Sequence, residues 1–230
     1  MPRSVVSNGA PRCARCQLPP RWCICPGLRT VECPVKVDVV MHHQETWRPS
    51  STGCLIKRVV PGSDVHLFQS GHPLDRAQIV RPGKTLWILH PRGDPLPATV
   101  SPTSLQILLL DGSWRQAGEM VHAVESWGRL ICMPASAESR YWLRSQAGEG
   151  TYSTIEALIF LLAALGLQNA QAQLRFQFEL HVYAGLCARG AKTKAEQYLE
   201  TSSVRGPLAE ATRGFFRYRA RGAEVPEKLK

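Results

Sequence analysis

The strongest constraint on the fold of this chain is an apolar segment that runs directly into a short polar motif. Residues 105–110 read Leu-Gln-Ile-Leu-Leu-Leu, and residues 111–114 read Asp-Gly-Ser-Trp. An apolar run of this length is typical of a strand that is buried on both faces of a parallel sheet. Ligands of open α/β sheets bind beyond the carboxyl ends of the strands. Asp111 is therefore the first candidate for a functional carboxylate.

A helix is expected directly after this strand, over residues 115–125. Gly112 allows a tight turn between the two elements. Ser113 and Asp111 are both suitably placed to cap the helix. Capping alone would account for Asp111, so a structural role and a functional role both stay open at this point.

The rest of the chain alternates between strand-like and helix-like segments, which is typical of an α/β protein. The strand that ends at Leu89 leads into residues 90–95, a loop rich in turn-forming residues, so a second strand carries polar groups at its carboxyl end. The expected strands are residues 35–41, 65–69, 85–89, 105–110 and 129–133, and the expected helices are residues 54–60, 115–125, 155–167, 171–188 and 192–199.

Four of the eight cysteines lie close together near the amino terminus, in the pattern Cys-x2-Cys, six residues, Cys-x-Cys. This spacing predicts that Cys13, Cys16, Cys23 and Cys25 supply the four thiolates of a closed structural zinc site. A disulfide pair and a redox Cys-x-x-Cys are the alternatives, and a reducing compartment argues against the disulfide. A catalytic zinc is disfavoured because four protein ligands leave no open position for a substrate.

The charge of the chain is consistent with an anionic partner such as RNA. The formal net charge is +10 over 230 residues, although many proteins are basic without such a partner. Residues 139–144 and 213–221 interleave arginines with aromatic residues, which suits RNA contact but also an ordinary surface loop or basic extension. No apolar run is long enough to span a bilayer, and the first residues lack the apolar core of a signal peptide. We therefore expect a cytoplasmic protein without a membrane partner.

Several short motifs, taken together, resemble the DTW-domain family. Asp111-Gly112-Ser113-Trp114 resembles the family's Asp-x-Thr-Trp signature, with Ser in place of Thr. The matches come in the family's order and cover about residues 13 to 190. The other resembling elements are the four-cysteine cluster, His42-His43-Gln44-Glu45 (His43 standing where the family usually has Pro), Ser51-Thr52-Gly53 (Ser for Asn) and Ser153-Thr154-Ile155-Glu156-Ala157.

The resemblance implies a tRNA-uridine aminocarboxypropyltransferase. Such an enzyme transfers the 3-amino-3-carboxypropyl group of S-adenosylmethionine to N3 of a tRNA uridine and releases methylthioadenosine. The implied fold is a SPOUT-like, trefoil-knotted, mainly parallel α/β sheet with flanking helices, plus a small N-terminal zinc knuckle. The corresponding regions are a tail and knuckle over residues 1–33, a catalytic domain over residues 34–205 and a basic C-terminal tail over residues 206–230.

The resemblance and the residue chemistry together suggest roles for individual side chains. Uridine N3 is protonated at neutral pH, so Asp111 is the candidate base, although it could instead hold Ser113 or the ligand amine. The hydroxyls of Ser113, Ser153 and Thr154 are candidates for holding the donor's carboxylate. Trp114 either stacks a base or packs. The remaining donor-binding candidates are Leu89, His90, Pro91, Gly93 and Glu156, and the RNA-contact candidates are His42, Arg48, Thr52, Arg115, Arg140 and Arg144.

Two other functions are compatible with the same residues. The first is an RNA methyltransferase that uses S-adenosylmethionine in the usual way. The second is a non-enzymatic RNA-binding module with a zinc knuckle. The oligomeric state stays open, and no motif specifies which tRNA or which uridine is chosen.

Overall fold

The protein is built around a five-stranded, entirely parallel sheet with the strand order β2-β1-β4-β3-β5. The structure is a computed structural model that describes residues 11–97, 100–133, 138–144 and 152–217. Strand β4 is central, paired with β1 on one side and with β3 on the other. The strands are β1 (Lys36–His42), β2 (Asp64–Phe68), β3 (Thr85–Asp94), β4 (Leu105–Asp111) and β5 (Arg129–Ile131).

Helices cover both faces of the sheet, as expected for parallel strands that are apolar on both sides. Helices α1 and α4 pack on the face that presents Val37, Val39 and Met41 of β1, and α5 packs against both of these helices. Helices α2 and α3 pack on the opposite face, against Val40 and Leu108. The helices are α1 (Thr52–Val59), α2 (Arg76–Ile79), α3 (Trp114–Val124), α4 (Thr154–Ala164), α5 (Gln168–Ala188), α6 (Lys192–Glu200) and α7 (Arg205–Arg217).

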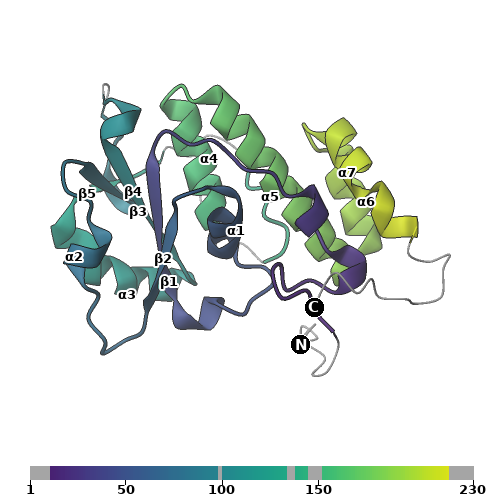
Figure 1. The fold of residues 1–230 in the computed structure, drawn as a ribbon, viewed down its shortest axis with the longest axis horizontal. Coiled ribbons are helices and arrows are strands. Elements are labelled where there is room, and N and C mark those ends of the chain that lie inside the picture. The colour runs from purple at the N-terminus through teal and green to yellow at the C-terminus, as the bar shows by residue number, and fades with distance from the viewer. Residues whose placement is uncertain (1–10, 98–99, 134–137, 145–151, 218–230) are drawn as a thin grey trace.

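The two ends of the described chain pack against the same part of the molecule. The cysteine-rich segment contains two short 3-10 helices, η1 (Pro20–Trp22) and η2 (Cys25–Gly27), and its residues Leu18 and Ile24 join the main core. Helices α6 and α7 extend from α5 on the side away from the sheet (Figure 1). In the described residues, no helix has the length and apolarity needed to cross a membrane.

The predicted strands and helices are confirmed as elements, with three differences. The short helix α2 (Arg76–Ile79) was not predicted. The loop predicted at residues 90–95 is largely part of β3, which continues to Asp94 through a register irregularity against β5. Gly93 permits this close approach, because a Cβ there would lie 2.4 Å from the backbone nitrogen of Ile131. The segment predicted as a basic tail forms helix α7 up to residue 217. Leu208 of this helix is fully buried. Residues 1–10 and 218–230 of the predicted tails lie outside the described part of the chain.

Candidate active site

The carboxylate of Asp111 lies at the carboxyl end of the central strand, held by the beginnings of two helices. Its Oδ1 accepts a 2.6 Å hydrogen bond from the Thr154 hydroxyl in α4, and its Oδ2 accepts a 2.9 Å bond from the Ser51 hydroxyl, which caps α1. Burial raises the pKa of the Asp111 carboxyl, and the hydrogen bond from Thr154 partly opposes that rise. Asp111 is thus a buried, oriented acid whose proton affinity exceeds that of an exposed aspartate.

The start of α1 comes unusually close to this carboxylate. A Cβ on Gly53 would lie 2.8 Å from both Cγ and Oδ2 of Asp111, so any larger residue would displace the carboxylate or the helix. Ser51 uses its hydroxyl twice: it donates to Asp111 and accepts from the backbone N–H of Cys54 at 3.1 Å. The Ser51-Thr52-Gly53 element therefore positions Asp111, a role that the sequence motif indicated only by its polar residues.

Helix α3 is capped by Ser113 and not by Asp111, which settles the capping alternative raised by the sequence. Ser113 and Gln116 form a capping box, in which Gln116 Oε1 accepts from the backbone N–H of Ser113 at 2.8 Å. Gln116 Nε2 also lies 3.0 Å from His42 Nδ1 and donates to Gln44 Oε1 at 3.0 Å. Gln116, which the sequence did not single out, thereby ties the end of β1 to the start of α3.

A cavity of about 480 Å³ opens beside Asp111, large enough for a nucleoside-sized ligand. The donor-binding candidates Leu89, His90, Pro91, Ser153 and Thr154 line it, as do Asp111, Ser113 and Trp114. Residues predicted from separate strand ends therefore meet around one space. Arg48, Thr52 and Arg144, predicted as RNA contacts, line the same cavity.

Two other predicted residues serve the framework of the site. Glu156 is buried and accepts hydrogen bonds from the backbone N–H and hydroxyl of Ser153 and from Ser139 and the Arg140 N–H. It therefore fixes the loop in front of α4 and is not among the residues that line the cavity. Gly93 likewise packs against β5 and not against the cavity.

The predicted RNA contacts fall in different places. The Arg140 guanidinium donates to Thr201 Oγ1 at 2.7 Å and to the Tyr198 carbonyl at 2.8 Å, so it joins the loop to α6. His42 is buried against Gln116, and burial lowers the pKa of its imidazole. Arg115 extends into solvent with its side chain 81% exposed and pairs with Glu119 on α3. Of these three, only Arg115 presents an accessible cation.

An ion cluster that the sequence did not reveal completes the wall of the cavity. Glu45 is fully buried, and its carboxylate pairs with Arg48 at 2.6 Å and with Arg144. Arg144 also donates to the Ser50 hydroxyl at 3.3 Å, and the Tyr141 hydroxyl donates to the Ser50 carbonyl. The position of Glu45 in the His42-His43-Gln44-Glu45 element was the only sequence signal for this cluster.

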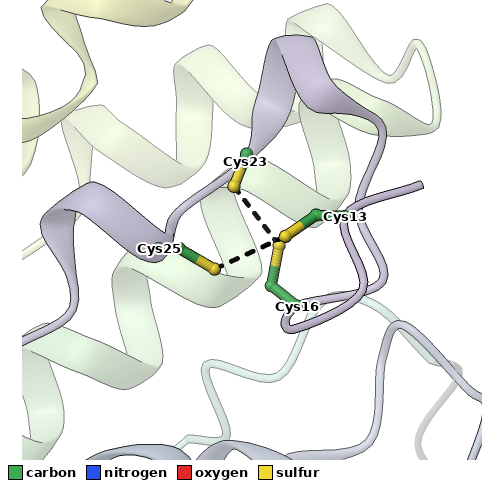
Figure 2. Close-up of side chains that lie close together, drawn as sticks. All are labelled: Cys13, Cys16, Cys23 and Cys25. Carbon is green, nitrogen blue, oxygen red and sulfur yellow. Dashed lines mark hydrogen bonds between the residues drawn. The ribbon is translucent and has the colours of Figure 1, made fainter. Parts of the chain in front are cut away.

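The four cysteines of the amino-terminal segment form one cluster (Figure 2). All four Sγ atoms lie within 4.8 Å of one another, with Cys13 and Cys25 at 3.6 Å and Cys16 and Cys23 at 3.7 Å. A tetrahedral site with Zn–S bonds of about 2.3 Å places its sulfurs about 3.8 Å apart, so the donor set fits zinc. The hydrogen bonds within the cluster lower the pKa of the buried Cys16 thiol and raise the pKa of the Cys23 and Cys25 thiols, so Cys16 is the first of the three to ionise.

The fold and the site together define an α/β protein whose ligand cavity lies at the carboxyl ends of its central strands, with a buried acid at its edge. A family model described as the DTW domain matches residues 10–184, and the chain belongs to the DTW-domain family. Its motif Asp111-Gly112-Ser113-Trp114 thus lies at the cavity, with Trp114 43% exposed.

The chain is also similar in sequence to a curated mouse protein. The Mus musculus protein named tRNA-uridine aminocarboxypropyltransferase 2 is 27% identical over 176 residues, which cover 69% of this chain and 58% of the mouse protein. The chain therefore spans little more than half the length of that relative. No solved structure matches this chain.

Proposed function

We propose that this protein transfers the 3-amino-3-carboxypropyl group of S-adenosylmethionine to N3 of a tRNA uridine. The observation that carries the proposal is the buried Asp111, held by two hydroxyls at the edge of a cavity of about 480 Å³. Membership of the DTW-domain family and similarity to a protein named for this activity support it. The reaction needs a base beside a ring nitrogen and a pocket for a nucleoside-sized donor; we assign the first role to Asp111 and the second to the cavity.

The reaction assigns Asp111 the role of general base. The carboxylate removes the proton from uridine N3 as N3 attacks the γ-carbon of the donor's methionine moiety. The N3–C bond forms, the C–S bond breaks, and the electron pair of that bond returns to sulfur. The sulfonium charge is thereby neutralised, methylthioadenosine leaves, and Asp111 later passes its proton to solvent. A pKa raised by burial makes the carboxylate a stronger base than an exposed one.

Most of the rate enhancement in this scheme comes from positioning. Attack at the γ-carbon, and not at the methyl group, requires the sulfonium to be bent so that the γ-carbon faces the uridine. Leu89, His90 and Pro91 within β3 and Ser153 before α4 line the same cavity as Asp111 and would hold the adenosine moiety. Fixing both reactants in such a geometry supplies several kcal/mol.

The outer features of the molecule fit the same scheme. Arg115 and the net charge of +10 provide cations for a polyanionic tRNA. We assign zinc in the four-cysteine cluster a structural role, because four thiolates leave no position open. The trefoil knot, the three predicted regions of the chain and a cytoplasmic location are further parts of this proposal.

Mass analysis of nucleosides tests the function directly. Bulk tRNA is incubated with the protein and S-adenosylmethionine and then digested. The expected result is a uridine that carries the aminocarboxypropyl group, together with methylthioadenosine in equal amount. A methylated nucleoside with S-adenosylhomocysteine would indicate a methyltransferase instead, and unmodified tRNA that is bound by the protein would indicate a binding module.

A further inference from the structure

The ion cluster in the cavity wall has more positive than negative charge. Glu45 contributes one buried carboxylate, and Arg48 and Arg144 each contribute a guanidinium. A buried carboxylate is tolerated only when cations and hydrogen bonds compensate it, which explains why both arginines turn toward Glu45. The pairing leaves one positive charge uncompensated within the cluster itself.

Asp111, the second acid near the two guanidinium groups, does not neutralise either of them by a direct contact. The hydrogen bonds of Asp111 come from the Ser51 and Thr154 hydroxyls. Among the described residues that line the cavity, the acidic side chain is that of Asp111. The cavity therefore contains two arginines that Glu45 orients but does not saturate, since each guanidinium has five N–H donors.

Both arginines remain accessible from the cavity. Their side chains are 46% exposed for Arg48 and 30% exposed for Arg144, whereas the Glu45 side chain is 1% exposed. Glu45 is therefore buried beneath the two arginines that it pairs with, and both arginines line the cavity. The fork of N–H donors on a guanidinium matches the oxygens of a carboxylate as well as those of a phosphate.

Two of the three hydroxyls that the sequence suggested for the donor's carboxylate already donate to acidic side chains of the protein. Thr154 donates to Asp111, and Ser153 donates to Glu156 at 2.8 Å. Ser113 accepts the N–H of Gln116 as a helix cap and keeps its own proton for donation, but it carries no positive charge. The two arginines are the cationic groups in the cavity wall that fit this task.

We infer that Arg48 and Arg144, oriented by the buried Glu45, form a subsite that binds the α-carboxylate of the donor's amino-acid moiety. This inference rests on the proposed function and replaces RNA phosphate by a small-molecule carboxylate as the partner of these two arginines. Glu45 is a positioning residue, because it acts through the arginines. Anchoring the carboxylate would help to fix the γ-carbon for attack beside Asp111.

The test compares two ligands that differ in one group. Binding of S-adenosylmethionine and of its decarboxylated form is measured by calorimetry for the full chain and for Arg144→Met and Arg48→Met. The unsubstituted protein should prefer the carboxylated ligand by about 10- to 100-fold, as expected for charge-assisted hydrogen bonds. Each variant should lose most of this preference while its affinity for the decarboxylated ligand stays the same.

Two further variants test whether Glu45 positions the two arginines and whether an exposed arginine outside the cavity affects donor binding. Glu45→Gln should weaken binding of S-adenosylmethionine but not of the decarboxylated form, because the arginines lose their orientation. Arg115→Met, which removes an exposed arginine outside the cavity wall, should leave both donor affinities unchanged. Melting curves establish that each variant is folded before binding is compared.

The outcomes distinguish the inference from the proposed function. If the unsubstituted protein binds the donor and Arg144→Met retains the carboxylate preference, the inference is overturned and the proposed function stands. Weaker tRNA binding by Arg144→Met with an unchanged donor affinity would overturn it in favour of a phosphate contact. Failure of the unsubstituted protein to bind S-adenosylmethionine at all would overturn both.

Discussion

Thr154 Oγ1 donates a 2.6 Å hydrogen bond to Asp111 Oδ1 and so joins the first residue of α4 to the last residue of β4. Ser51, the cap of α1, holds the other carboxylate oxygen at 2.9 Å. Three segments that are far apart in sequence therefore converge on one acid. This arrangement fixes the direction of the carboxylate and influences its pKa, and both effects can be measured.

Removing the Thr154 hydroxyl should shift the pH dependence of the reaction. The hydroxyl stabilises the ionised carboxylate, so Thr154→Val should raise the pKa of Asp111 further. Because the base must be ionised, the acidic limb of the pH–rate profile should move to higher pH. Thr154→Ser, which keeps the hydroxyl, should restore the original limb. An unshifted profile for Thr154→Val would contradict the assignment of Asp111 as the titrating group.

The raised pKa of Asp111 also predicts how stability depends on pH. A carboxyl whose pKa is higher in the folded state favours folding when protonated, and this contribution is lost as pH rises through the folded-state pKa. The free energy of unfolding should therefore fall with rising pH relative to that of Asp111→Asn. Urea unfolding of both proteins between about pH 4 and pH 8 measures the difference. A difference that stays constant over this range would argue against a raised pKa.

Gly53→Ala should disturb the site even though alanine suits a helix. The added Cβ would lie 2.8 Å from Asp111 Oδ2 and 2.9 Å from Met41 Cε, so the carboxylate or the helix must move. We expect a loss of about 1–3 kcal/mol in stability, together with a lower turnover rate. Gly118→Ala on α3, where the added Cβ has nothing within 4 Å, is the matched control. Equal behaviour of the two variants would show that the close approach is not restrictive.

Metal removal should destabilise the amino-terminal segment. The four cysteines pack on the core through Leu18 and Ile24, so loss of a zinc ion would loosen that contact. The protein should contain one zinc per chain by elemental analysis, and Cys16→Ser should lose it and melt at a lower temperature. Cys54→Ser, a change outside the cluster, should keep the metal. Purified protein that contains no zinc, or a melting temperature that a chelator leaves unchanged, would contradict this assignment.

Arg115→Met should weaken tRNA binding in a salt-dependent way. Its side chain is 81% exposed at the start of α3, one residue from the Trp114 that lines the cavity. If it contacts a phosphate, the slope of log affinity against log salt should fall by about 1. Binding titrations at several salt concentrations provide this slope. An unchanged slope would place the RNA backbone elsewhere on the surface.

The strands could be predicted from the sequence because their apolar runs have a single favourable interpretation. Leu105–Leu110 needs burial on both faces, so the central position of β4 and the location of Asp111 at its end follow from composition alone. The cysteine spacing likewise indicated a cluster, and the four Sγ atoms converge. A local sequence pattern can predict the position of a residue when that position depends on a single strand, helix or loop.

The remaining features of the site depend on contacts between distant elements, which no local pattern encodes. Glu45 looked like an ordinary polar residue at a strand end, yet Arg144, which is 99 positions away, pairs with it in the interior. Arg140 had the composition of an RNA contact, but Tyr198 and Thr201 of the distant α6 region bind its guanidinium. The turn-forming residues 90–93 lie within β3 as an irregularity, because Leu89 and Asp94 on either side of them both pair with Ile131 of β5.

The most direct test of the central role of Asp111 is the single-turnover rate of transfer by Asp111→Asn with saturating tRNA and S-adenosylmethionine. A general base contributes about 10²- to 10⁴-fold, so the rate should fall by that factor while the affinities for both substrates change little. An Asp111→Asn variant that transfers the group at the rate of the unsubstituted protein would contradict the proposed role of this carboxylate.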